Sequence, residues 1–172
     1  MTRIAAALWA LAVFGWAVSY LPASAAPALL SVAVLEFELI DTSLEGASRG
    51  VDQAETLRLT RISGLLRDLL AASGKYKVVD LAPAAAKIAD AGLIHGCNGC
   101  DLAIASTLGA ERVITGTVQK ISTLILTLSI FEREVATGRN VQVAIAQIRG
   151  NTDQSWTRGV EWLVQNRLLA AQ

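Results

Sequence analysis

The stretch LILTLSIFEREVATGRNVQVAIAQIR, residues 124–149, decides the predicted fold. In residues 124–136, aliphatic side chains occupy every second position from Leu124 to Ile130, which predicts a strand with one strongly apolar face. Residues 141–149 repeat the alternation with Val141, Val143 and Ile145, and the intervening Thr-Gly-Arg-Asn at 137–140 is typical of a turn. The two strands are therefore predicted to form an antiparallel hairpin.

The segments on either side of this hairpin supply the remaining predicted elements. Their composition and apolar periodicity separate strands from helices. Three segments rich in β-branched and aliphatic residues are predicted strands: 29–40, 75–81 and 111–122. Four segments are predicted helices: 54–73, 83–91, 100–108 and 155–170. Two polar or glycine-containing segments are predicted loops: 41–53 and 93–99.

This order, β-α-β-α-α-β-β-β-α, indicates an α+β fold. Helices packed on one face of a mixed sheet would bury the apolar side of both layers. The three C-terminal strands should form an antiparallel meander. The first two strands are joined through a helix, so they are expected to be parallel with a right-handed crossover.

The N-terminus has the pattern of a cleavable signal peptide. Arg3 is followed by an apolar run at residues 4–21, by Pro22 and by Ala23-Ser24-Ala25, which predicts cleavage after Ala25. The chain would then comprise a signal peptide, 1–25, and a single domain, 26–172. An uncleaved anchor is the alternative, because about 18 apolar residues is the lower limit for a spanning helix. Either reading predicts a periplasmic or secreted domain, and no later segment is apolar enough to span a membrane.

Composition excludes two classes of protein. The chain is 53% hydrophobic and 17% charged, which is too apolar for a disordered chain. Its 15 basic and 15 acidic residues balance, and no basic stripe is present that could bind phosphates. Nucleic-acid binding is therefore not expected.

Three segments resemble a known group of domains: VAVLEFELIDT at 32–42, LLAASGKYKVVD at 69–80 and CDLAIASTLGAERVITGTVQKIS at 100–122. They are similar to α/β domains of the TolB N-terminal type and to curli-secretion (CsgG-like) domains. CNGC at 97–100 together with IRGNTDQSWTRG at 148–159 further resembles an uncharacterised family of small predicted secreted bacterial proteins. The resemblance implies periplasmic partner binding or envelope assembly, and it brings no catalytic residues with it.

The only cysteines, Cys97 and Cys100, are predicted to form a disulfide in an oxidising compartment. The closed loop is small, so the entropic gain is only about 2 kcal/mol. Thiol–disulfide exchange is an alternative, because Cys100 lies near a helix start, which lowers a thiol pKa. His95 and Asp101 could add metal ligands, but no second Cys/His pair exists elsewhere. No metal, other cofactor or catalytic residue is therefore predicted.

The turn before the last helix is the predicted contact site. Asn151 or Asp153 could cap this helix, whose free N–H groups favour anions, and Arg149 and Arg158 would add positive charge. The site would suit a small anionic ligand or a carboxylate of a partner. The alternative is a capped helix with solvated arginines.

These observations predict a periplasmic or secreted accessory or binding protein that is not an enzyme. It would act through contacts with another envelope protein or with a small ligand, since no nucleotide-binding, nucleophile-elbow or zinc-protease motif is present. A redox protein using Cys97 and Cys100 is one alternative. An envelope-assembly subunit that oligomerises through an exposed sheet edge is another.

Intact mass tests the predictions for the leader and the cysteines together. Protein taken from the periplasm is expected to have the mass of residues 26–172 less two hydrogens. Its thiols should resist alkylation until a strong reductant is added. A mass that retains the leader would indicate an anchor, and readily alkylated thiols would favour the redox alternative.

Overall fold

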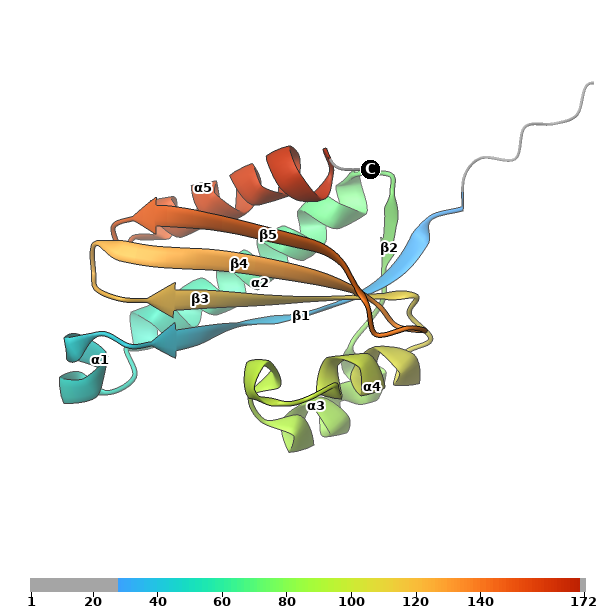
Figure 1. Cartoon of the computed structure of the whole chain (residues 1–172), viewed down its shortest axis with the longest axis horizontal. Coiled ribbons are helices and arrows are strands. Elements are labelled where there is room, and N and C mark those ends of the chain that lie inside the picture. Colours follow the sequence, from blue (N-terminus) through green and yellow to red (C-terminus); the bar gives the residue numbers. More distant parts are fainter. Residues whose placement is uncertain (1–27, 171–172) are drawn as a thin grey trace, which may run out of the picture.

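The computed structural model describes residues 28–170, so the predicted signal peptide lies outside the described residues. The sheet has five strands in the order β2-β1-β3-β4-β5 (Figure 1). β1 is parallel to β2 and β3, whereas β3, β4 and β5 are antiparallel neighbours. The predicted α+β class, mixed sheet and C-terminal meander are confirmed. The strands are β1 (Leu30–Asp41), β2 (Tyr76–Val78), β3 (Arg112–Lys120), β4 (Ile125–Glu134) and β5 (Asn140–Arg149).

The helices follow the predicted order, with short additions. The helices are α1 (Leu44–Arg49), α2 (Gln53–Ala72), α3 (Ala85–Ala91), α4 (Cys100–Thr107) and α5 (Asp153–Leu163). α5 continues as a π-helical turn over Val164–Leu168, and 3₁₀ turns occupy Ala82–Ala84 and Ile94–Gly96. α1 lies in a predicted loop, where Ser43 caps it by accepting a hydrogen bond from the Gly46 N–H. Its sequence is mostly polar and contains a glycine, so no apolar periodicity marks this short helix.

Helices lie on both faces of the sheet. α2 and α5 cover one face, where the main core lies, as Figure 1 shows behind the strands. α3 and α4 cover one end of the opposite face over a smaller core. The predicted one-sided packing therefore holds for α2 and α5 but not for α3 and α4. The reason is that β1 is apolar on both sides: Val32 and Val34 enter the main core, and Ala33 and Leu35 enter the smaller one.

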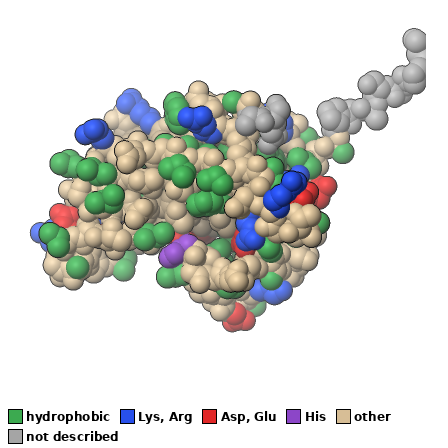
Figure 2. All heavy atoms as spheres, viewed as in Figure 1, with side chains coloured by type: hydrophobic (Ala, Val, Ile, Leu, Met, Phe, Trp, Pro, Cys, Tyr) green, Lys and Arg blue, Asp and Glu red, His purple; other side chains and the backbone are tan. Residues whose placement is uncertain are grey.

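The rest of that opposite face is open. On this face no helix of the described residues covers β4 and β5. The side chains of Val143 and Ile145 therefore remain 46% and 54% exposed. Figure 2 shows apolar side chains over this open face. On the covered face, Leu126, Leu128 and Ile130 are fully buried. The predicted apolar face of residues 124–136 is therefore the one that packs on the helices.

A buried ion cluster closes the main core at the ends of β1 and β3. Lys120 is 4% exposed, and its Nζ lies 2.7 Å from Glu55 Oε1 and 3.2 Å from Asp41 Oδ2. Glu55 is 1% exposed and also accepts a hydrogen bond from Asn151 Nδ2. Asn151 Oδ1 in turn accepts from the Trp156 indole N–H at 3.0 Å. One buried lysine therefore links β1, β3, α2 and the turn that leads into α5.

The contacts shift the pKa values in this cluster. Burial alone lowers the pKa of Lys120, but hydrogen bonds to Glu55 and Asp41 outweigh burial and raise it. Burial alone raises the pKa of Asp41, but hydrogen bonds from Ser43 and Lys120 outweigh it and lower it. The contribution of Asp41 to stability is therefore present above its unfolded pKa and lost as the pH falls. That of Lys120 is present below its unfolded pKa and lost as the pH rises.

The close packing of α5 depends on a glycine. A Cβ on Gly159 would overlap the Leu128 side chain and lie 2.8 Å from Ile148 Cγ2. Gly159→Ala is expected to lower the free energy of unfolding by about 1–3 kcal/mol through overpacking, despite the better helix propensity of alanine. Gly64→Ala in α2 is the matched control, since nothing lies within 4 Å of its Cβ. The control should raise stability by up to about 1 kcal/mol in urea unfolding. Equal gains in both variants would show that α5 does not pack this closely.

Removing the buried ammonium should expose the energetic role of the cluster. Lys120→Met leaves Glu55 and Asp41 without their cation and is expected to cost about 3–5 kcal/mol in urea unfolding at neutral pH. Adding Glu55→Leu should restore most of this loss. The advantage of the wild type should be constant between about pH 5 and 9 and shrink outside that window, given the two pKa shifts. An additive double variant would mean that the two side chains do not interact.

Candidate functional site

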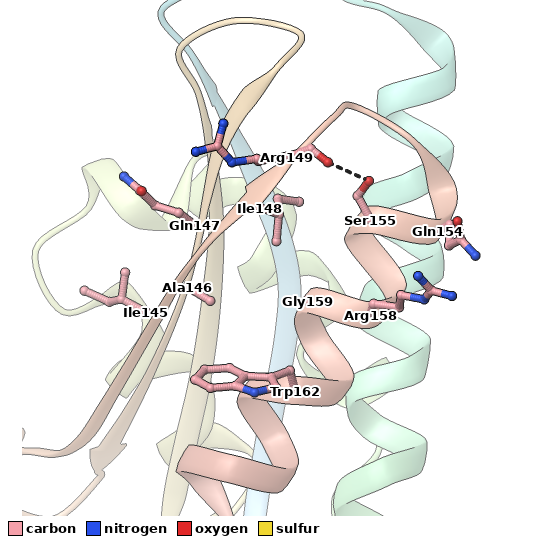
Figure 3. A pocket seen from close by; sticks show the side chains of 10 residues that line it. All are labelled: Ile145, Ala146, Gln147, Ile148, Arg149, Gln154, Ser155, Arg158, Gly159 and Trp162. Carbon is pink, nitrogen blue, oxygen red and sulfur yellow. Dashed lines mark hydrogen bonds between the residues drawn. The ribbon is translucent and has the colours of Figure 1, made fainter.

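A groove of about 650 Å³ runs between the edge strand β5 and helix α5 (Figure 3). Ile145, Gln147 and Arg149 line it from the strand, and Ser155, Arg158 and Trp162 line it from the helix. Figure 3 shows Arg149 near one end, Trp162 near the other, and Arg158 on the helix between them. The groove is therefore long, open and bordered by one strand edge and one helix.

The turn between β5 and α5 fixes the upper end of this groove. Thr152 caps α5, because its side chain accepts a hydrogen bond from the Ser155 N–H. The Ser155 hydroxyl donates to the Arg149 carbonyl at 3.1 Å, as the dashed line in Figure 3 shows. Gly150 has φ +82°, which favours glycine at this sharp change of direction. Asn151 or Asp153 was the predicted cap, but α5 starts at Asp153, so the capping position falls on Thr152.

The structure divides the four predicted contact residues into two pairs. Arg149 and Arg158 line the groove. Asp153 instead contacts α2, where its carboxylate is 2.8 Å from Arg58 Nε and also pairs with Arg61. The hydrogen bond from Arg58, followed by that from Arg61, lowers the pKa of Asp153. The Asn151 side chain is hydrogen-bonded to Glu55 and to Trp156. Asp153 and Asn151 therefore hold the fold together, whereas the two arginines border the groove.

The groove is basic and partly aromatic. Neither the Arg149 nor the Arg158 guanidinium makes an ion pair or hydrogen bond with another described side chain. Trp162 is 45% exposed, and the Arg167 guanidinium carbon lies 5.4 Å from its ring centroid, which is cation–π geometry. No Asp or Glu is among the described residues that line the groove. The groove can therefore attract carboxylates and offers one aromatic surface.

Trp162 and Lys120 were not among the predicted functional residues. Trp162 follows Arg158 by four residues and Gln154 by eight, which places all three on one helix face. The predicted helix, 155–170, contained the spacing of Arg158 and Trp162, whereas Gln154 lay just before its start. Lys120 continues the alternation of Ile114, Gly116 and Val118, which marks it as an inward-facing charge at the end of a strand.

A second cavity, of about 420 Å³, lies beside the disulfide on the opposite face of the sheet. The structure joins Cys97 and Cys100 as predicted, at the start of α4. Glu38 accepts hydrogen bonds from the His95 N–H at 2.8 Å and lies 2.7 Å from His95 Nδ1. Both carboxylate oxygens of Asp101 accept a hydrogen bond from Arg133 Nη1, each at 2.9 Å. These charged groups are paired with one another, so they fasten the disulfide loop to the sheet.

Two kinds of feature are absent from residues 28–170. No group of three or more His, Cys, Asp or Glu side chains is arranged to hold a metal ion. No helix in this range is both long and apolar enough to cross a membrane. Neither finding concerns the predicted leader, which lies outside the described residues.

Comparison with solved structures identifies the fold. The LpoB C-terminal domain from Salmonella enterica is 16% identical with a TM-score of 0.50, over 73% of this chain and 86% of that chain. A point variant of PelC from Paraburkholderia phytofirmans, described as a dodecamer, is 16% identical with a TM-score of 0.50, over 80% and 90%. TolB from Acinetobacter baumannii is 12% identical, over 82% of this chain and 28% of that chain, at a TM-score of 0.45 that supports no further conclusion. At these identities the likeness shows a shared fold alone.

Comparison with curated proteins gave no match. The family whose model matches is DUF3280, described as "Protein of unknown function (DUF2380)", and the match spans residues 30–168. This range includes all five strands and all five α-helices of the described residues. The chain therefore belongs to this family.

Proposed function

We propose that this chain is a non-enzymatic accessory protein of the bacterial cell envelope that binds a protein partner in the β5–α5 groove. The observation that carries the proposal is the pair Arg149 and Arg158, which border a groove beside an exposed tryptophan and have no ionic partner among the described residues. Exposed charge and aromatic area of this kind do not stabilise the fold, but they are typical of binding surfaces. The location in the cell envelope is proposed from the predicted signal peptide, residues 1–25.

The surroundings of the disulfide support a role other than catalysis. Both sulfurs are bonded to each other, so the nearest histidine, His95, has no thiolate to activate. His95 is itself held by Glu38. Backbone N–H groups of Ile94 and His95 also donate to Glu38, which fastens the loop to β1. We therefore propose that the disulfide has a structural role, with thiol–disulfide exchange as the alternative that alkylation tests.

Self-assembly is the second candidate function, favoured by one observation. PelC, which has the same fold, is described as a dodecamer. In this chain β5 is the last strand of the sheet, so its outer edge is available for pairing. A concentration-dependent oligomer of the purified protein would favour assembly. A monomer would favour the accessory role.

Charge reversal in the groove tests the accessory role. Affinity capture from periplasmic extract with wild-type protein is expected to recover a specific partner. Arg149→Glu together with Arg158→Glu should lower that recovery at least tenfold, because the groove would then repel carboxylates. The matched control is Arg49→Glu with Lys77→Glu, which changes the net charge equally at exposed sites outside the groove. The control should bind like the wild type.

Two results would contradict this proposal. A partner lost equally from both double variants would reflect net charge and not the groove. A wild-type chain that recovers nothing specific from extracts of cells grown under several conditions would leave the accessory role without a partner. Circular dichroism should show the same folded spectrum for all three proteins before capture is compared.

A further inference from the structure

We infer that the groove receives an extended, acidic segment of the partner, which pairs with the outer edge of β5 as a sixth strand. This inference rests on the proposed function and specifies how the partner binds. It follows from three features of the groove: the direction of the β5 backbone groups, the length of the groove, and the distribution of charge along it.

The backbone of β5 offers hydrogen-bonding groups to the groove. The Gly150 N–H donates to the Leu124 carbonyl on the β4 side, whereas the Arg149 carbonyl faces the other way and accepts from Ser155. Backbone groups point to alternate sides along a strand, so those of Gln147, Ile145 and Val143 also face outward. β5 ends the sheet, and no described strand pairs with this side. The outward groups of residues 143–147 can therefore form a ladder with an added strand.

The groove has the length of a short strand. Gln154, Arg158 and Trp162 line it at intervals of four residues. Eight residues of helix span about 12 Å at 1.5 Å per residue. An extended chain covers that distance with about four residues. The outward-facing stretch of β5, residues 143–147, has a similar length, so strand and helix border one extended segment along its whole course.

The charges define the sequence of that segment. Arg158 borders the groove on α5, Arg149 borders it at the end of β5, and Arg167 lies over Trp162 at the other end. Successive side chains of a strand point to opposite faces of the sheet, so an added strand would present every second residue to α5 and the others to the open face. Acidic residues suit the first set, beside Arg158. In the second set, apolar residues suit the positions next to the exposed Val143 and Ile145, and an acidic residue suits the position next to Arg149. The expected segment therefore alternates acidic and apolar residues, with a further acidic residue at the Arg149 end.

A second copy of this chain fits the groove less well. The strand that it would contribute, NVQVAIAQIR, contains no acidic residue and ends in an arginine. Pairing of β5 with β5 of another copy would therefore add one arginine to the groove and no carboxylate. The charge of the groove thus favours a different protein as the source of the added strand.

Selection of peptides on the mature protein tests this inference. The probe is a random dodecapeptide library displayed on phage, followed by fluorescence anisotropy with the selected peptides. We expect enrichment of peptides in which Asp or Glu alternates with apolar residues. Their affinity should fall at least tenfold in the Arg149→Glu, Arg158→Glu double variant, and it should weaken as salt is raised. Enrichment without acidic residues, or no enrichment, would overturn the inference.

A proline in β5 separates strand pairing from simple charge attraction. Gln147→Pro removes one outward N–H and none of the N–H groups that face β4, and proline is tolerated on edge strands. It should lower peptide affinity at least tenfold. Gln147→Thr, which keeps the N–H, should bind within twofold of the wild type. Equal binding by both variants would overturn strand pairing.

Amide hydrogen exchange gives the same test without a substitution. A bound peptide should slow exchange at Val143, Ile145 and Gln147, whose N–H groups face outward, far more than at Ala144 and Ala146, which face β4. Unchanged exchange at the three outward amides in the presence of saturating peptide would overturn strand pairing even if Gln147→Pro fails to fold. If the captured partner depends on Arg149 and Arg158 but not on the N–H of residue 147, the proposed function survives and this inference fails.

Discussion

The arrangement of this protein depends on how one buried ammonium group is satisfied. Lys120 lies almost entirely out of water, and a charge in that position is tolerated only when it is paired and hydrogen-bonded. Its partners come from the end of β1 and from the first turn of α2. The same interaction therefore positions the long helix against the sheet. Because the paired carboxylate of Glu55 needs further donors, the cluster extends to the turn that follows β5.

This extension connects the core to the groove. Asn151 contacts Glu55 with its amide nitrogen and Trp156 with its amide oxygen, so the first turn of α5 is tied to the buried cluster. One turn later, Gly159 allows the helix to approach β4 and β5 closely. The spacing between α5 and the edge of β5 is thus determined by interior contacts. Arg158 and Trp162 are carried on that helix, so their distance from β5 is set by these interior contacts together with the Ser155–Arg149 hydrogen bond at one end of the groove.

The sequence predicted those parts of the fold in which one pattern dominates. Residues 124–130 alternate strictly, so the pairing of β4 with β5 and the buried face of β4 were foreseeable. In β5 the alternating Val141, Val143 and Ile145 instead lie on the exposed face, and the smaller Ala144 and Ala146 pack on the core. β1 is apolar on both faces, which indicates burial on two sides but not which helices supply it, and the placement of α3 and α4 was missed for that reason. At the site, Arg149 and Arg158 both border the groove, whereas Asn151 and Asp153 contact Glu55 and Arg58. Adjacency in a turn does not determine whether a side chain lies at the groove or against α2.

The two cavities differ in what their charges are free to do. Beside the disulfide, Glu38 and Asp101 are bound to His95 and Arg133, so both carboxylates already have partners within the fold. Along the groove, the arginines have no such partner among the described side chains. An exposed strand edge is a hazard for any sheet protein, and basic side chains beside it discourage pairing between identical copies. The same charges attract an acidic strand. One feature of β5 and α5 can therefore exclude the wrong partner and select the right one.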